Sequence, residues 1–245
     1  MIIYAKERSD AAIADVVGAY LPADMNDYIL IRLTGEPVET LCSISAEYSK
    51  YVTHEGGKKV LYLRLKKVLY GCMQSAILWY NTFKGCLEEM GFKLNRYDPC
   101  VANMIINGKQ CTICWYVDDT KMSHVDEKVV SSVIQKIEER FGKMVVTRGK
   151  VHNFIGMDVT FKENGTVEIL MKDYITECFE AFGEPINKNA NTPAKNHVFE
   201  VVESPSLDDR KMEVFHHIVA KLLYVSKRAR VDIDLAVSYL CTRVS

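Results

Sequence analysis

Apolar residues recur every three or four positions in two stretches of the chain. The first stretch covers residues 76–90 and is followed by Gly91, and the second covers residues 129–141 and is followed by Gly142. This spacing places the apolar side chains on one face of a helix, and glycine commonly follows a helix end. We therefore predict two amphipathic helices. Their apolar positions are Ile77, Tyr80, Phe83, Leu87 and Met90 in the first, and Val129, Val130, Val133, Ile134, Ile137 and Phe141 in the second.

Shorter apolar runs, separated by turn residues, predict antiparallel strands. Residues 101–117 form two such runs joined by Asn107-Gly108, a pair that readily adopts the positive φ angles of a tight hairpin turn. Residues 120–125 are long enough to return as a further strand, and residues 11–17 have the pattern of a core strand. A second Asn-Gly pair, at 164–165, predicts another hairpin within residues 159–170.

The last third of the chain is predicted to be mainly helical. Residues 172–182 form an amphipathic pattern, a polar, proline-containing stretch at 183–206 has the composition of a connector, and a helical tail follows from about residue 208 to residue 244. Helices beside a hairpin predict an α+β fold, with helices on one face of an antiparallel sheet.

Composition limits the class of protein. The 245 residues are 48% hydrophobic, yet no stretch approaches the roughly 18 consecutive apolar residues of a membrane span, and the start of the chain lacks a secretory signal pattern. We therefore expect an intracellular protein that is not secreted and has no membrane partner, with its eight cysteines reduced. Cys111 and Cys114 are three apart in a predicted strand, so their side chains point to opposite faces and a zinc site is not expected.

The charge of the chain does not by itself indicate a function. The chain has 31 basic and 32 acidic residues, which gives a net charge of −1. This balance argues against a nucleic-acid-binding domain, because such domains usually carry an excess of basic charge. Basic residues are concentrated at 58–67, 141–150 and 221–230. Each segment fits contact with a phosphate backbone or an ordinary solvated surface, and charge alone favours the second interpretation.

Three aspartates stand out because of where they lie in the apolar pattern. Asp118 and Asp119 end an apolar run at a predicted turn, where an isolated pair would simply cap the turn. Asp15 lies inside the apolar run at 11–17, where a charge is costly unless it is paired or binds a cation. If the two strands are neighbours, Asp15 and Asp118 converge, and a divalent cation with oxygen ligands would relieve their repulsion.

A set of short motifs then resembles the reverse transcriptase of copia-type retrotransposons. The motifs are DVVGAYL at 15–21, LYGCMQS at 69–75 with LWY at 78–80, YDPC at 97–100 and YVDD at 116–119, followed by FIGM at 154–157, YI at 174–175, NTP at 191–193 and LLY at 222–224. Each motif alone is a weak signal, but their order and spacing together are specific. The resemblance covers nearly the whole chain from about residue 10.

The resemblance implies a polymerase palm that transfers nucleotides to a primer 3′-hydroxyl with two Mg²⁺ ions, or Mn²⁺ in their place. One ion would activate the hydroxyl and the other would neutralise the triphosphate. Asp15 and Asp118 would be the main metal ligands, with Asp119 in support and the backbone carbonyl of Val16 as a further ligand. The implied partners are an RNA or DNA template with its primer, and deoxynucleoside triphosphates.

The resemblance also assigns residues to a nucleotide pocket and to primer binding. Tyr20 would lie under the sugar and exclude a 2′-hydroxyl, although a core aromatic explains the same residue. Gly71 would allow close backbone approach, and Ser75 would also cap the helix that follows. Trp79 is interpreted as a core residue. The implied nucleotide-binding set is Tyr20, Tyr70, Gly71, Gln74, Ser75, Tyr116 and Val117, and the implied primer-binding set is Phe154, Ile155, Gly156 and Met157.

Two domains follow from the resemblance: a palm with residual fingers at 1–165, and a thumb- or connection-like helical region at 166–245. About ten residues precede the strand of Asp15, so we expect most of the fingers to be missing and nucleotide binding by the isolated chain to be weak. Because the sequence stops near Ser245, we also expect no ribonuclease H domain. The chain would act in the cytoplasm, a virus-like particle or the nucleus, alone or within a polyprotein. A second interpretation stays open: a degenerate or domesticated fragment that keeps the fold and binds nucleic acid or a protein without catalysis.

Overall fold

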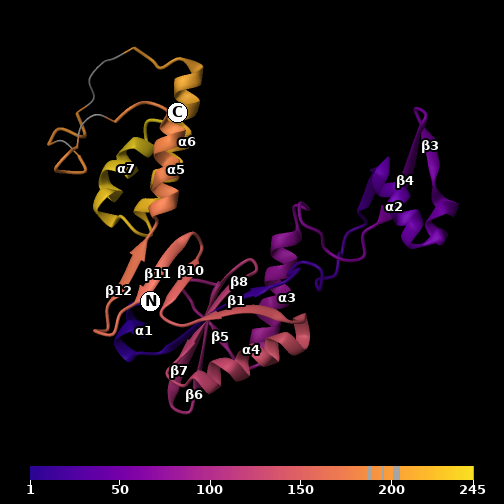
Figure 1. Ribbon diagram of the computed structural model, residues 1–245, viewed down its shortest axis with the longest axis horizontal. Helices are drawn as coiled ribbons and strands as arrows, with labels where there is room; N and C mark the ends of the chain where they lie inside the picture. The colour runs from indigo at the N-terminus through magenta and orange to yellow at the C-terminus, as the bar shows by residue number, and fades with distance from the viewer. Residues whose placement is uncertain (187–188, 195, 201–204, 245) are drawn as a thin grey trace. The chain divides into compact units, whose positions relative to one another are not determined.

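The computed structural model describes residues 1–186, 189–194, 196–200 and 205–244. Internal contacts divide the chain into two compact units (Figure 1). One unit comprises Met1–Ile13, Ser123–Glu127 and Thr147–Ser245, and the other comprises Ala14–Met122 and Lys128–Val146. Each unit is described by itself.

Most residues of a six-stranded sheet belong to the second unit. It contains the predicted hairpin, in which Val101 pairs with Cys114 and the turn residues Asn107 and Gly108 have φ of 52° and 74°. The strand expected at 120–125 is also present. In spatial order the strands are β5 (Lys93–Leu94), β6 (Val101–Ile106), β7 (Lys109–Tyr116), β8 (Asp119–His124), β1 (Asp10–Val16) and β9 (Met144–Arg148).

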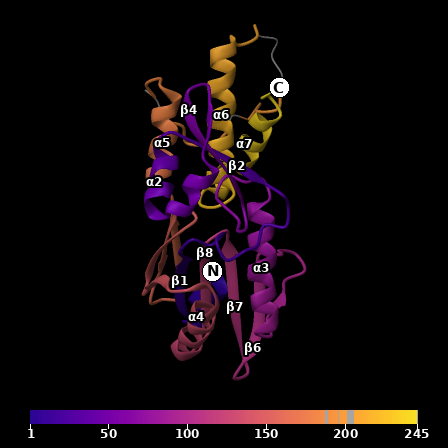
Figure 2. The ribbon, with the colours of Figure 1, turned by 90° about the vertical axis from the view of Figure 1, so that its right-hand side faces the viewer.

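Two helices, α3 (Ser75–Glu89) and α4 (Glu127–Phe141), accompany this sheet (Figure 2). All six apolar positions predicted for α4 are buried. The ring of Phe83 on α3 contacts Trp115 of β7 and Phe141 of α4, with centroids 5.5 and 5.9 Å apart. The two helices therefore share one apolar core with the sheet, which confirms the predicted α+β class.

The buried face of α3 differs from the predicted one. Ile77 was expected on the apolar face but is 54% exposed, whereas Trp79 and Cys86 are buried beside Phe83 and Leu87. The reason is that both faces of this helix carry apolar residues, so periodicity alone does not decide which face meets the sheet. The large ring of Trp79 takes the interior position.

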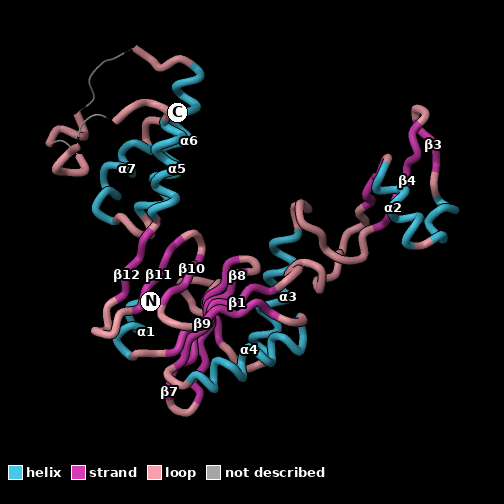
Figure 3. Tube along the Cα trace, in the orientation of Figure 1, coloured by secondary structure: helices cyan, strands magenta, loops and turns pink. Residues whose placement is uncertain are grey.

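A second, three-stranded sheet in this unit was not predicted. Its order is β2-β4-β3, and α2 and a 3₁₀ helix connect β2 to β3 (Figure 3). One sequence signal for it was overlooked: Gly56-Gly57, both with positive φ, joins the last two strands as a hairpin turn. The elements are β2 (Leu30–Thr34), α2 (Glu36–Ile44), the 3₁₀ helix (Ala46–Tyr51), β3 (Thr53–Glu55) and β4 (Lys58–Arg64).

The first unit contains another antiparallel sheet and a group of helices. The expected second Asn-Gly hairpin is present between β11 and β12, but its turn is wider than predicted because only Gly165, and not Asn164, has a positive φ. The helix at 172–182 matches the prediction, and the described part of the connector has neither helix nor strand. The elements are α1 (Ile2–Glu7), β10 (Val151–Phe154), β11 (Met157–Phe161), β12 (Val167–Leu170), α5 (Lys172–Phe182), α6 (Asp209–Ser226), a 3₁₀ helix (Val231–Ile233) and α7 (Asp234–Cys241).

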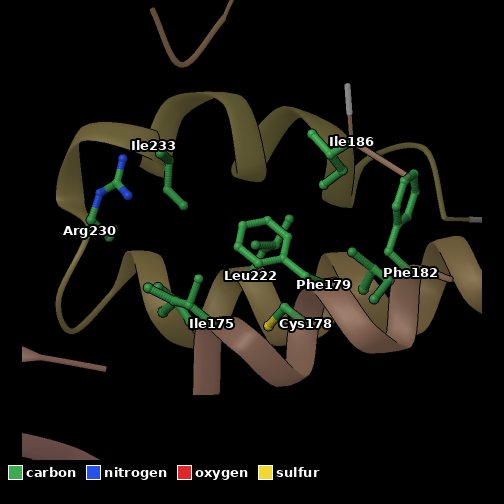
Figure 4. Close-up of a pocket in the computed structure, with 10 residues that line it drawn as sticks. Ile175, Cys178, Phe179, Phe182, Ile186, Leu222, Arg230 and Ile233 are labelled. Carbon is green, nitrogen blue, oxygen red and sulfur yellow. The ribbon is translucent and has the colours of Figure 1, made fainter. Parts of the chain in front are cut away.

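The C-terminal helices enclose an apolar cavity of about 280 Å³ between α5 and α6 (Figure 4). Its lining includes Phe179, Phe182 and Leu222, with Arg230 at one end. The predicted helical tail consists of α6, a 3₁₀ helix and α7. None of the helices in the described ranges has the length and apolar character that a bilayer crossing would require.

Candidate active site

The YVDD motif forms a two-residue turn between β7 and β8. Val117 and Asp118 make the turn, and Asp119 begins the next strand. Val117 has φ of 58°, a left-handed conformation that β-branched residues rarely adopt. The indole Nε1 of Trp79 donates a hydrogen bond of 2.6 Å to the carbonyl oxygen of Val117. The turn that presents Asp118 is therefore held from the buried face of α3.

The neighbouring strand brings Asp15 to the same place. β1 lies beside β8 in the sheet, and the Val16 backbone N–H donates to the Asp118 carbonyl oxygen at 3.3 Å. β1 is buried along most of its length, but Asp15 is only half-buried. The structure thus places the three sequence-predicted carboxylates on adjacent strands at one end of the sheet, although Asp15 is far from the other two along the chain.

The carboxylates influence one another electrostatically. The pKa of Asp15 is raised, first by burial and then by the charge of Asp118. The pKa of Asp119 is also raised, by burial and then by the charges of Asp118 and Asp15. Within the described ranges no lysine, arginine or histidine forms an ion pair with any of the three. In the described part of the chain, the site therefore concentrates negative charge with no ion-paired basic residue to balance it.

This donor set suits a hard divalent cation, because carboxylate and carbonyl oxygens are the ligands that Mg²⁺ prefers. The backbone carbonyl of Val16 follows Asp15 directly on the same strand. As the side chains stand, however, no three Asp, Glu, His or Cys residues of the described chain are gathered closely enough to enclose a metal ion. The residues fit the cation by charge and chemistry, and their convergence on a shared ion stays a prediction.

Charge crowding predicts a stability effect. We expect Asp15→Asn to raise the melting temperature by about 1–2 °C in metal-free buffer at neutral pH, because repulsion between partly exposed charges costs roughly 0.5 kcal/mol. Since the folded-state pKa of Asp15 lies above its ordinary value, the charge destabilises the fold above that pKa. The difference should therefore shrink as pH falls through it, which thermal melts over a pH series measure. A native chain more stable than the variant at neutral pH would contradict this account.

Two tyrosines lie beside the carboxylates. The ring of Tyr20 is buried and meets Tyr70 edge-on, with centroids 4.4 Å apart. The hydroxyl of Tyr70 donates a long hydrogen bond of 3.4 Å to the Asp118 carboxylate, and burial together with the Asp118 charge raises the pKa of both phenols. Two of the three tyrosines of the predicted nucleotide pocket, Tyr20 and Tyr70, are thus in contact with each other next to Asp118.

The other residues predicted for the nucleotide pocket differ in their contacts and in their exposure. Gly71 has φ of 91° and open space where a side chain would point, which fits close approach of a ligand to the backbone. The Gln74 amide donates to the Asp27 carboxylate, and Tyr116 is exposed. Ser75 does not cap α3 as predicted: Gln74 is the N-cap residue, and the Ser75 hydroxyl instead donates to the Leu69 carbonyl at 2.5 Å. The helix simply begins one residue earlier than expected.

The predicted primer-binding residues form a tight hairpin turn in the first unit. Ile155 and Gly156 both have positive φ, between the buried residues Phe154 and Met157 that end β10 and begin β11. The Tyr224 hydroxyl of α6 donates to the Ile155 carbonyl at 2.9 Å. The hairpin is therefore well held within its own unit.

Two residues have features that the sequence pattern did not indicate. Trp79 was interpreted as core, and it is buried as predicted, but the periodicity of α3 gave no sign of its bond to Val117. Lys121 lies on β8 with 4% exposure, and burial lowers its pKa to about 8. A lysine two residues after Asp119 in a predicted strand was the available signal.

Comparison with known proteins agrees with the sequence motifs. Residues 14–196 match the model of a family described as reverse transcriptase (RNA-dependent DNA polymerase). Two Gag-Pol polyproteins of Saccharomyces cerevisiae, from transposons Ty1-BR and Ty1-GR3, are 26% and 25% identical to the chain over 245 residues. These alignments cover 94% of the chain but only 12% of each polyprotein.

Among solved structures, apo telomerase from Candida tropicalis, truncated from the C-terminal domain, is similar with 14% identity and a TM-score of 0.35. The alignment covers 69% of this chain and 38% of that one.

Proposed function

The chain belongs to the reverse transcriptase family, with a copia-type set of motifs, and from this premise we propose that it is the core of an RNA-directed DNA polymerase of a retrotransposon. One observation supports the proposal most: Asp15 on β1 lies beside the turn of Asp118 and the strand that Asp119 begins, and none of the described ion pairs balances their charge. In this reading the six-stranded sheet with α3 and α4 is the polymerase palm.

The proposed roles follow from chemistry that the residues can perform. Asp15, Asp118 and Asp119 would hold two Mg²⁺ ions, or Mn²⁺ in their place, with the Val16 carbonyl as a further ligand. When bound, the ions lower the pKa of the primer 3′-hydroxyl and neutralise the triphosphate. The turn at Val117 sets where the Asp118 carboxylate points.

The proposal also covers the rest of the chain. Residues 1–165 would be the palm with residual fingers, and residues 166–245 a thumb- or connection-like region. The hairpin at Phe154, Ile155, Gly156 and Met157 would contact the primer strand. The partners would be a primed RNA or DNA template and deoxynucleoside triphosphates. Because both named relatives are Gag-Pol polyproteins, a polyprotein context inside the cell is part of the proposal.

The test is primer extension by the 245-residue chain on a primed RNA template with Mg²⁺, read by gel alongside a chelator control. Template-dependent extension that the chelator abolishes is the expected result, even if it is slow. A second candidate is a degenerate or domesticated fragment that keeps the fold and binds a protein or nucleic acid without catalysis. The near-neutral net charge favours it over a working polymerase, because nucleic-acid-binding domains usually carry an excess of basic charge. Binding of the primed template, with no extension under Mg²⁺ or Mn²⁺, would favour that candidate.

Tyr20 gives a prediction about sugar selection. If its ring lies under the nucleotide sugar, Tyr20→Ala should raise the ratio of ribonucleotide to deoxynucleotide incorporation at least about tenfold, because removing the ring opens space for a 2′-hydroxyl. Steady-state kinetics with each nucleotide measure the ratio. The exposed Tyr62→Ala is the matched control. A lower melting temperature with unchanged discrimination would instead identify Tyr20 as a core aromatic.

A further inference from the structure

The turn that carries Asp118 has a conformation that needs external support. Val117 is β-branched, and its φ of 58° lies in the left-handed region, where a side chain crowds its own backbone. Such residues persist where the surrounding structure holds them in place, and they cluster at functional sites. The question is which contact holds Val117.

A side-chain hydrogen bond from Trp79 reaches the Val117 backbone. Its indole Nε1, which can only donate, points its single N–H at the Val117 carbonyl oxygen 2.6 Å away. The indole is 1% exposed and is fixed by Phe83 and Phe141, whose ring centroids lie 5.3 and 5.1 Å from its own. A donor that rigid fixes the orientation of the peptide between Val117 and Asp118.

The backbone hydrogen bond made by Asp118, the next residue, depends on this orientation. The Asp118 carbonyl oxygen accepts a hydrogen bond of 3.3 Å from the Val16 N–H. This bond joins the turn to the strand that carries Asp15. If the Val117 carbonyl rotates, the Asp118 side chain and this cross-strand bond move with it. The indole therefore acts on the spacing between Asp15 and Asp118 through the backbone alone.

The same arrangement occurs at the other two-residue turn with a left-handed β-branched residue. Ile155 has φ of 52°, and the phenol of Tyr224 donates to its carbonyl at 2.9 Å. At both turns a side chain from a helix donates to the carbonyl of the strained residue. This repetition argues that the bond compensates for the strained conformation and is not incidental to core packing.

We propose that Trp79 is a positioning residue, whose indole N–H holds the left-handed Val117 and thereby sets the Asp118 carboxylate against Asp15. The effect on catalysis rests on the proposed polymerase function, whereas the effect on turn geometry does not. Trp79→Phe keeps most of the buried ring and removes the N–H. Trp115→Phe is the matched control, because Trp115 is also buried in this aromatic cluster and contacts Phe83.

The test combines a structural and a kinetic measurement on the full chain. In Trp79→Phe, hydrogen exchange of the Val16 amide is expected to accelerate about tenfold, and kcat for primer extension to fall about tenfold with KM for the nucleotide little changed. Trp115→Phe should leave Val16 exchange and kcat within about twofold of the native chain. Because glycine adopts positive φ without strain, Trp79→Phe should cost less than about threefold in a Val117→Gly background.

The effect of Trp79 on the turn geometry and its effect on catalysis can be told apart by these measurements. Equal losses from Trp79→Phe in both backgrounds, with Val16 exchange no faster than in Trp115→Phe, would show that Trp79 only fills the core. If the native chain extends no primer, Val16 exchange still decides the point. Faster exchange in Trp79→Phe alone then supports the positioning role, while the missing extension counts against the polymerase function only.

Discussion

Asp118→Asn is expected to lower the rate of primer extension by at least about 10³-fold. The substitution keeps the size and hydrogen-bonding oxygen of the side chain but removes the charge that would hold the metal ions. Metal-based charge stabilisation in such transfers contributes several kcal/mol to the transition state, and each 1.36 kcal/mol is about tenfold in rate. Asp118 is also the residue whose charge raises the pKa of both neighbouring aspartates, so its loss removes the centre of the negative site.

Single-turnover extension on a primed RNA template measures this effect, with the chain in excess over the primer. The matched control is Asp173→Asn, the same change on the exposed side of α5, which should leave the rate within about twofold. The fold should survive Asp118→Asn, because the substitution relieves like-charge repulsion. Extension by Asp118→Asn at close to the native rate would remove Asp118 from the chemistry and, with it, the polymerase assignment of this site.

Phe83→Ala is expected to destabilise the chain by about 3–5 kcal/mol. Phe83 is fully buried on α3 and its ring contacts Trp79, Trp115 and Phe141, so truncation opens a cavity where two helices and the sheet meet. For a chain of this size each kcal/mol corresponds to roughly 2–4 °C, so the melting temperature should fall by about 6–20 °C.

Ile77→Ala on the same helix is the informative control. Both residues belong to the apolar stripe that periodicity predicts, but Ile77 is 54% exposed, so its truncation should change the free energy of unfolding by no more than about 0.5 kcal/mol. Denaturant unfolding of the two variants measures the contrast. Equal destabilisation by both would mean that α3 packs through the predicted stripe and not through the face seen in the structure.

A strained turn and a neighbouring strand place three carboxylates at one end of the six-stranded sheet. The turn supplies Asp118 and Asp119, the strand supplies Asp15, and the helix behind them supplies the indole that fixes the turn. The concentration of charge destabilises the metal-free chain locally. A bound cation would reverse that effect, because it stabilises the charged form of each carboxylate.

The features that could be predicted from the sequence depend on neighbouring residues or on the order of short motifs. The burial of α4 followed from spacing along one helix, because its apolar residues are confined to a single face. The hairpin at Asn107-Gly108 followed from φ preferences of two adjacent residues. The motif order likewise indicated the family and singled out the three aspartates, without any knowledge of how the strands pair. In each case the information lies within a few neighbouring residues or in their order.

Features that depend on contacts between residues distant in sequence could not be predicted from the sequence and are seen in the folded structure. Apolar residues on two faces of α3 left its orientation open, and the contacts of Trp79 and Phe83 with β7 and α4 settled it. The adjacency of β1 and β8 and the bond from Trp79 to Val117 likewise join distant segments. A periodic pattern specifies which face of an element is apolar, but it carries no information about which other element covers that face. Strand order and single hydrogen bonds between elements are therefore set by packing of the whole unit.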